Sequence, residues 1–479
     1  MVFGVILGSR SVSRFQCGGW MEFSLRFSDK EITPWGGMAI MKRMLDHMGF
    51  DAALSASGLP QPGSNRGYAP AQLITQFMLS VWCGANRFEH TEVTRHDPVL
   101  KRVFGFKRMA NFKAILRLFA RFTQGSNESV MDSLYRWVFD QISINGVTLD
   151  LDSTVMTRYG AQEGAARGYN PSKRGRASHH PLMAFVADTR MIANCWLRPG
   201  NAASASNAEG FLANTIHRLG RTKVALLRAD SGFADNAFLD HLDEMKLHHI
   251  IALRQTQPIQ RALVNAGDWW ALVDDNGTAV PGIELTRFQY QANSWSKARW
   301  VIGIRQHIKA RLDSGGAKGK TLNLFADDPI VGQYRFSALT TDLDLPATAI
   351  WRMYRGRADC ENRIKELKYD FAADSFNMKN FWGTEAAMNT VMLAFNLMSL
   401  MRQALMKHPD VRQSKTPIQR TLQTLRYKLF AKPAFITTEG RKPILNLAIA
   451  MQKRAWIEGL WDAAETFDLP AEFKPLYSP

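Results

Sequence analysis

The stretch MYRGRADCENRIKELK, residues 353–368, is rich in Arg and Lys and carries a glutamate in its middle. Wound as a helix, it places four polar residues of different chemistry in one stripe about 60° wide: Tyr354, Arg357, Glu361 and Lys368. Apolar residues lie beside the stripe (Met353, Cys360, Ile364 and Leu367), and the far side, with Arg363 and Glu366, is expected to be solvated. A carboxylate at the edge of a buried face can point into a cleft. The alternative is a surface helix covered with charge pairs.

The chain is strongly basic. It has 479 residues, 46% of them hydrophobic, and its 60 Lys and Arg against 43 Asp and Glu give a net charge of +17. Such a balance predicts a polyanionic partner, with a nucleic-acid backbone favoured over a membrane surface. Four widely spaced cysteines (Cys17, Cys83, Cys195 and Cys360) form no CxxC pair. No secretory signal or membrane span is expected either, so the cytoplasm is the predicted location.

The periodicity of the sequence changes along the chain. Residues 35–140 have helical periodicity and cluster basic residues between 87 and 121, which suits a helical, DNA-facing region or an ordinary helical bundle. From residue 144 strand patterns (144–154, 182–188, 192–201, 223–233 and 248–255) alternate with helical ones (204–220 and 234–247). This alternation predicts a mixed α/β sheet. Residues from about 257 to 340 hold further short strands, expected at 282–293, 298–308, 321–328 and 334–342, with several Trp residues nearby. Helical patterns then return and continue into a basic C-terminal region.

Two aspartates stand out at the ends of predicted strands. Asp152 lies two residues after Asp150, so both side chains emerge on one face of the strand. Asp230 ends the apolar run VALLRAD, residues 224–230. Singly, an Asp in such a place is more often a cap or turn former. Together with Glu361, however, these carboxylates would repel one another unless a cation lay between them.

Carboxylate-only ligands favour Mg²⁺, or Mn²⁺ in its place, over zinc. Two such ions about 3.5–4 Å apart can activate a water or a 3′-hydroxyl and stabilise the leaving oxygen of a phosphodiester. Arg357 and Lys368 share the stripe of Glu361 and could hold the flanking phosphates, with Tyr354 packing nearby.

The spacing Y-(2)-R-(3)-E-(6)-K resembles the signature of the IS4-type DDE transposases, at Tyr354, Arg357, Glu361 and Lys368. LDLDST (149–154) and LRADSGF (227–233) are similar to the two Asp motifs of the same superfamily, in the same order. Residues 144–405 are most similar to the IS1380 group of insertion-sequence transposases.

This resemblance implies an RNase H-like fold and two-metal DNA strand transfer. It also implies that Asp152, which is followed by a small residue and Thr, is the metal ligand in preference to Asp150. The expected catalytic and metal-binding set is therefore Asp152, Asp230 and Glu361. By the same analogy one Trp of the insertion, which the sequence does not identify, stacks on a flipped base, although core packing is the commoner role of such a residue.

The predicted organisation is an α/β protein whose RNase H-like mixed-sheet catalytic domain is interrupted by a β-rich insertion and flanked by helical regions. Its segments are an N-terminal extension (1–34), a helical DNA-binding domain (35–143), the first part of the catalytic core (144–256), the insertion (257–340), the second part of the core with the Glu361 helix (341–410) and a basic helical C-terminal region (411–479).

The loop YNPSKRGRASHHP, residues 169–181, carries three basic residues near Asp152: Lys173, Arg174 and Arg176. We expect them to grip DNA close to the metal ions; a solvated loop tip is the alternative.

The function these features predict is a bacterial transposase that cuts at the terminal inverted repeats of its element and joins the 3′ ends to target DNA, as a homodimer on DNA. The alternatives are a catalytically retired, transposase-derived DNA-binding protein and an RNase H-like nuclease without strand transfer.

Overall fold

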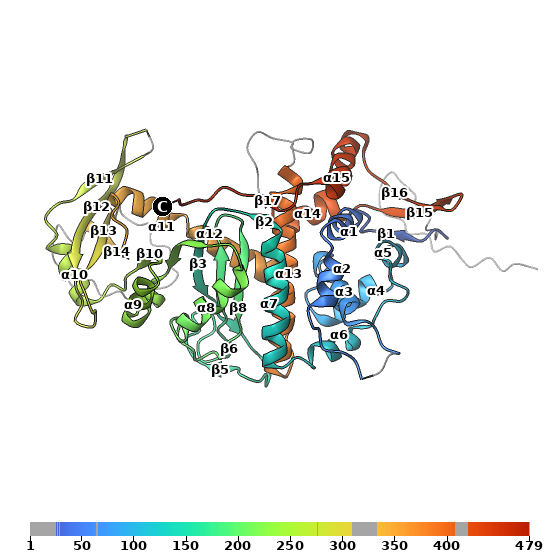
Figure 1. The fold of residues 1–479 in the computed structure, drawn as a ribbon, viewed down its shortest axis with the longest axis horizontal. Coiled ribbons are helices and arrows are strands. Elements are labelled where there is room, and N and C mark those ends of the chain that lie inside the picture. Colours follow the sequence, from blue (N-terminus) through green and yellow to red (C-terminus); the bar gives the residue numbers. More distant parts are fainter. Residues whose placement is uncertain are drawn as a thin grey trace, which may run out of the picture.

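A large mixed sheet forms the centre of the protein. The structure, a computed structural model, describes residues 29–63, 66–274, 276–308, 333–407 and 420–478, together with Leu25 and Phe27. Across these residues the sheet has nine strands, in the order β11 (Trp270–Val273), β12 (Ala279–Tyr290), β13 (Arg299–His307), β14 (Tyr334–Thr341), β10 (His248–Ala252), β9 (Val224–Ala229), β3 (Val147–Ser153), β7 (Leu182–Val186) and β8 (Met191–Trp196). Figure 1 shows β11–β14 at one end of the molecule and the N-terminal helices toward the other.

The directions of the strands confirm the expected mixed α/β sheet. β3, β7 and β8 form an antiparallel meander, whereas β9 runs parallel to β3 and β10 parallel to β9. The parallel steps use helical crossovers, α8 (Ala208–Leu219) before β9 and α9 (Asn236–Glu244) before β10. Because β9 and β3 are parallel neighbours, the residues that follow them emerge at the same edge of the sheet.

The β-rich stretch between residues 257 and 340 continues the central sheet. β12, β13 and β14 are an antiparallel meander, and β14 pairs with β10, whose edge would otherwise expose its backbone groups. The short helix α10 (Gln257–Val264) and β11 were not predicted. The strand expected at 321–328 lies outside the described residues.

A long buried helix, α13 (Phe381–Gln403), packs against β8 and against α7 (Gln124–Asp140), beside which it lies in Figure 1. Its Asn396 side chain accepts a hydrogen bond from the Ile192 N–H at 2.7 Å and donates one to the Ile192 carbonyl at 2.8 Å. This side chain therefore satisfies backbone groups on the edge strand β8, which explains a polar residue within an apolar run. None of the helices in the described ranges has the length and apolar character needed to cross a membrane.

The N-terminal region is helical, as expected. Its helices are α1 (Met38–His47), α2 (Phe50–Ala56), α3 (Pro70–Trp82), α4 (Thr91–Arg95), α5 (Pro98–Val103) and α6 (Phe112–Phe119). Side chains of Asp97 and Asn111 cap α5 and α6 by accepting a backbone N–H, and Thr123 does the same for α7.

The prediction of a basic helical C-terminal region is wrong in part, because this region also contains a β-hairpin. After α14 (Leu422–Leu425) and a π-helical turn (Arg426–Phe430) the chain forms the hairpin β15 (Ala434–Glu439) and β16 (Lys442–Leu447), before α15 (Arg454–Thr466). The short N-terminal strand β1 (Ile32–Thr33) pairs with β15. The two strands pair residue by residue, from Ala434 with Leu447 to Glu439 with Lys442, and this backbone pairing forms a hairpin between segments of helical pattern. Residues 1–24 and 411–419 of the expected terminal segments lie outside the described residues.

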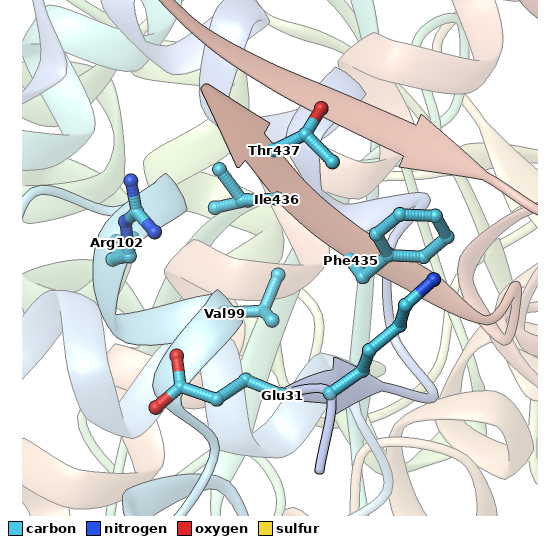
Figure 2. A pocket seen from close by; sticks show the side chains of 7 residues that line it. Glu31, Val99, Arg102, Phe435, Ile436 and Thr437 are labelled. Atoms are coloured by element: carbon cyan, nitrogen blue, oxygen red, sulfur yellow. The ribbon is translucent and has the colours of Figure 1, made fainter. Parts of the chain in front are cut away.

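A pocket of about 230 Å³ lies where the hairpin meets α5, and Figure 2 shows Val99, Ile436 and Phe435 among the side chains around it. The pocket contains none of the carboxylates predicted from the sequence.

The helical and sheet regions share one hydrophobic core. It includes Met38 of α1, Leu149 of β3, Phe395 of α13 and Leu460 of α15. The C-terminal tail is tied to this body as well: β17 (Ala471–Glu472) pairs with β2 (Ile142–Ser143), and Figure 1 shows the chain ending beside α11.

The single helix expected over the signature is two helices, α11 (Ala347–Arg355) and α12 (Ala358–Tyr369). The break falls at Gly356, where an added Cβ would lie 2.9 Å from Nη1 of Arg228. Burial of Cys360, Ile364 and Leu367 confirms the predicted apolar face.

The predicted solvated face of this helix is partly wrong. Arg363 is 5% exposed and donates to the carbonyls of Val186 and Ala187, and Glu366 pairs with buried Arg402. Arg363 and Glu366 thus both have partners on other parts of the fold. Helical periodicity alone cannot predict such contacts.

Candidate active site

Strand β3 carries two aspartates with different partners. The Asp150 carboxylate is fully buried and accepts two hydrogen bonds from Arg228 of β9, at 2.7 and 2.9 Å. Arg228 also donates to the carbonyl of Met353 in α11. Asp150 thus belongs to a buried ion pair that joins β3, β9 and α11 and leaves its oxygens occupied.

Asp152 lies at the end of β3 and is 8% exposed. Its Oδ1 accepts the N–H of Ser153 at 2.8 Å, and its Oδ2 lies 3.1 Å from Nη2 of Arg357. Burial raises the pKa of Asp152 from 3.8 to about 6, although Arg357 opposes this, and the negative charges of Asp230 and Glu361 raise it further. Asp230 and Glu361 are therefore each close enough to Asp152 to act on it electrostatically.

Asp230 follows β9 directly. Leu151 of β3 is paired with Ala229 of β9, so Asp152 and Asp230 are the next residues on two parallel neighbours. The Asp230 side chain accepts the N–H of Gly232 at 2.9 Å and so closes a tight turn. The cap-forming role considered for this residue is present, together with its place beside Asp152.

Residues at the junction of α11 and α12 attach to the same strand ends. The Tyr354 hydroxyl donates to the Ala229 carbonyl at 3.3 Å, and Nη2 of Arg357 donates to the Leu151 carbonyl at 3.2 Å. Each bond falls on the residue just before an aspartate. The backbone that presents Asp152 and Asp230 is therefore fastened to the helix pair.

Lys368 holds the next part of the chain. Its Nζ donates to the Thr154 hydroxyl at 2.6 Å and to the Val155 carbonyl at 3.0 Å. Glu361 is the exposed member of the four-residue signature, and its side chain makes no hydrogen bond or ion pair with any described residue. Tyr354, Arg357 and Lys368 thus orient the helix that presents Glu361. Contact of Arg357 and Lys368 with phosphates stays a prediction.

The donor set has the chemistry of a magnesium site: three carboxylates and no sulfur or imidazole. In the described parts of the chain, no three Asp, Glu, His or Cys side chains are yet gathered closely enough to hold one ion. Burial disfavours the ionised form of the Asp152 carboxylate. A divalent cation bound there would offset this cost.

Lys173, Arg174 and Arg176 lie in the loop between β5 (Ala166–Arg167) and β6 (Ala177–His179). These two strands form a small sheet with β4 (Met156–Thr157), in the order β4-β6-β5. All three basic residues are exposed. Lys173 and Arg176 lie over the ring of Tyr159, at 5.5 and 5.9 Å from its centroid, and this ring is itself 69% exposed. A basic and aromatic surface therefore begins seven residues after Asp152.

Sequence reasoning missed several residues that shape this site. Arg228 and Tyr159 are two, and Arg198 and Ser204, described below, are two more. The alternation of β9 could have indicated Arg228, because an Arg inside a buried strand requires an anionic partner. The Trp expected to stack on a base is not distinguished: Trp295 is buried, Trp269 lies under Arg305, and Trp270 is 53% exposed.

The raised pKa of Asp152 predicts a specific pH dependence of stability. A carboxyl whose folded pKa is raised stabilises the fold below pH 3.8, and this contribution is lost as the pH rises through about 6. In EDTA, we therefore expect the difference in unfolding free energy, wild type minus Asp152→Asn, to fall between pH 3.8 and about 6. Below and above this range the difference should be constant. Chemical unfolding at a series of pH values measures the difference. A difference that does not change with pH would show that Asp152 titrates normally.

The chain was compared with known proteins. Residues 16–465 match the model of a family described as transposase DDE domain group 1. No curated protein matches the chain in sequence. Among solved structures, a piggyBac transposase synaptic complex with hairpin DNA is similar at 11% identity, over 84% of this chain and 81% of that one, with a TM-score of 0.41. Because the family model spans nearly the whole chain, the protein belongs to the transposase DDE domain group 1 family.

Proposed function

We propose that this protein is the transposase of an insertion sequence of the IS4 type, most similar to the IS1380 group. It cuts DNA at the ends of its element and joins the freed 3′ ends to target DNA. The observation that carries the proposal is the register of β3 and β9, which places Asp152 and Asp230 side by side. Tyr354 and Arg357 attach the Glu361 helix to the same two strands.

The strand order supports an RNase H-like core. Read from one edge, the order is β8-β7-β3-β9-β10, an antiparallel meander followed by two parallel strands. In this assignment the catalytic carboxylates come from the central strand β3, its neighbour β9 and a helix that follows the sheet in sequence. Residues 257–340 are then the insertion between the second and third of them.

Asp152, Asp230 and Glu361 would hold Mg²⁺, with Mn²⁺ able to replace it. Bound there, the ions would supply an activated water or 3′-hydroxyl and stabilise the leaving oxygen at a phosphodiester. The protein's own contribution is placement. Arg357 keeps Asp152 at the edge of the sheet, Tyr354 fixes the end of β9, and Lys368 holds the chain that leaves β3. Ionic partners that orient such ligands also keep the site ordered before DNA arrives.

DNA would approach over the β4-β6-β5 sheet. Lys173, Arg174 and Arg176 are exposed there, and the chain of β4 continues directly from Asp152. These three basic side chains, which follow Asp152 closely in the chain, would bind the phosphates that flank the phosphodiester being cut. The terminal inverted repeats and the target duplex are the proposed ligands, two copies of the chain would assemble on them, and the bacterial cytoplasm is the proposed location.

Charge reversal on this loop should weaken DNA binding. Replacing Arg174 and Arg176 with Glu should lower affinity and make the slope of log K against log salt shallower by about 2, because each lost phosphate contact removes nearly one released counterion. Fluorescence anisotropy at several salt concentrations measures both. Arg221→Glu with Lys223→Glu makes the same charge change at the opposite end of β9, where both residues are exposed, and should have a smaller effect. Equal effects of the two pairs would contradict a specific DNA grip on this loop.

The function itself is tested with a labelled duplex that carries the element end, a target plasmid and Mg²⁺. The transposase proposal requires nicking at the end followed by joined products. Nicking without joining would favour a nuclease of the same fold. Binding without any cutting would favour a retired DNA-binding protein.

A further inference from the structure

A short loop, residues 199–206, lies against the two turns that follow Asp152 and Asp230. Arg198, just before it, is 7% exposed and donates four hydrogen bonds to backbone carbonyls at 3.0–3.2 Å. One acceptor belongs to His180, and the others belong to Ala203, Ser204 and Ser206. The imidazole Nδ1 of His180 in turn lies 2.8 Å from the carbonyl of Ala202. A planar guanidinium with fixed donor directions thus holds a loop that has no helix or strand of its own.

This clamp places Ser204 between the turns that carry the aspartates. On one side its hydroxyl lies 3.1 Å from that of Ser153, whose N–H binds Asp152. On the other side it fills the space above Gly232, whose N–H binds Asp230. A Cβ on Gly232 would lie 2.8 Å from the Ser204 Cβ and 2.9 Å from an Asp230 oxygen. Ser204 therefore touches both turns, and there is room for little more than a serine.

We propose that Ser204, held by Arg198 and His180, is a positioning residue that sets the separation of the Asp152 and Asp230 carboxylates. This inference rests on the proposed function, in which both carboxylates bind the same metal site. The pairing of β3 with β9 ends at Leu151 and Ala229, so beyond that point the separation of the two turns also depends on what fills the space between them. Among the described residues no direct side-chain bond joins the two turns. A wider space would pull the two ligands apart without touching either of them.

The test enlarges the spacer and, separately, loosens its clamp. Ser204→Leu should push the two turns apart, and Arg198→Lys should release the loop because an ammonium cannot reach carbonyls in several fixed directions. For both variants we expect Mn²⁺ affinity of the DNA-free protein to fall by about 10-fold or more, the range typical of residues that orient metal ligands. Ser204→Ala keeps the spacer and should lose less. Titration calorimetry with MnCl₂ measures affinity, and the Mg²⁺ concentration for half-maximal cleavage gives a second readout.

Matched controls separate positioning from general loss of stability. Ser294→Leu makes the same change in the loop between β12 and β13, at an exposed residue. Arg426→Lys loosens another Arg that donates to three carbonyls, those of Val81, Trp82 and Asp370. Both controls should keep the Mn²⁺ affinity of the wild type, even if Arg426→Lys lowers the melting temperature.

The outcomes distinguish this inference from the proposed function. If the wild type binds Mn²⁺ and cuts while Ser204→Leu and Arg198→Lys bind Mn²⁺ within about twofold of it, the positioning role is overturned and the transposase proposal stands. Weakening of the same size in Arg426→Lys would also overturn it, because loss of stability would then explain the effect. If the wild type neither binds Mn²⁺ nor cuts, both proposals fail.

Discussion

Glu361→Gln should leave DNA binding intact and slow cleavage at the element end by about 10²–10³-fold, since a metal ion supplies several kcal/mol of transition-state stabilisation. The substitution keeps the shape of the side chain and removes one negative ligand. Glu361 is exposed and its side chain bonds to no described residue, so its loss should cost the fold little. Single-turnover cleavage with Mg²⁺ and anisotropy on the same duplex measure rate and affinity.

Glu244→Gln is the matched control, because Glu244 is an exposed carboxylate at the end of α9, away from the strand ends that carry the aspartates. It should cut at the wild-type rate. Equal cutting by Glu361→Gln and wild type would mean that the active site lies elsewhere. Loss of DNA binding by Glu361→Gln would instead assign this residue to the DNA interface.

Asp150→Ala should lower the unfolding free energy by about 3–5 kcal/mol, the cost typical of removing one partner from a buried ion pair. Asp150 is completely buried and Arg228 is 3% exposed. Without the carboxylate, the guanidinium would stay charged in an apolar setting, next to the break between α11 and α12. We expect Asp152→Asn to show the opposite profile, with cleavage lost and stability nearly kept. Urea unfolding of the two variants, beside their cleavage rates, measures the contrast.

A double variant provides the control for this second prediction. Replacing Asp150 with Val and Arg228 with Met removes both charges at a similar total side-chain volume, so it should recover much of the lost stability. If Asp150→Ala unfolds like the wild type, the pair does not hold the strands together. If Asp150→Asn alone abolishes Mn²⁺ binding while the protein stays folded, Asp150 is the ligand and the preference for Asp152 is wrong.

The central sheet was accessible from the sequence because its strands alternate with helices and end in turn-forming residues. β3, β7, β8, β9 and β10 were all expected, and so were α8 and α9. Residues within each of these elements lie on a single repeating period, so local pattern suffices to predict them. The β15–β16 hairpin was missed because its signal is short and lies between helical segments.

The residues of the signature were predicted, and their contacts were not. A helical projection places Arg357 and Glu361 on one stripe, but it cannot show that Arg357 reaches Asp152 or that Tyr354 reaches the end of β9. Arg363, expected in solvent, is buried against the carbonyls after β7. Each of these contacts joins elements that are distant in the chain.

From the sequence alone, local periodicity predicted the strands and helices of the central sheet. The resemblance of a few polar residues to a known signature indicated a DDE transposase and which carboxylates to suspect. The tertiary structure decided which aspartate is engaged by Arg228, why Gly356 and Gly232 have no side chain, and that Ser204 lies between the two aspartate turns. The physical reason is that burial and ion pairing depend on the distance between side chains in space. The register of β3 with β9, the helices packed on them and the loop that carries Ser204 set that distance.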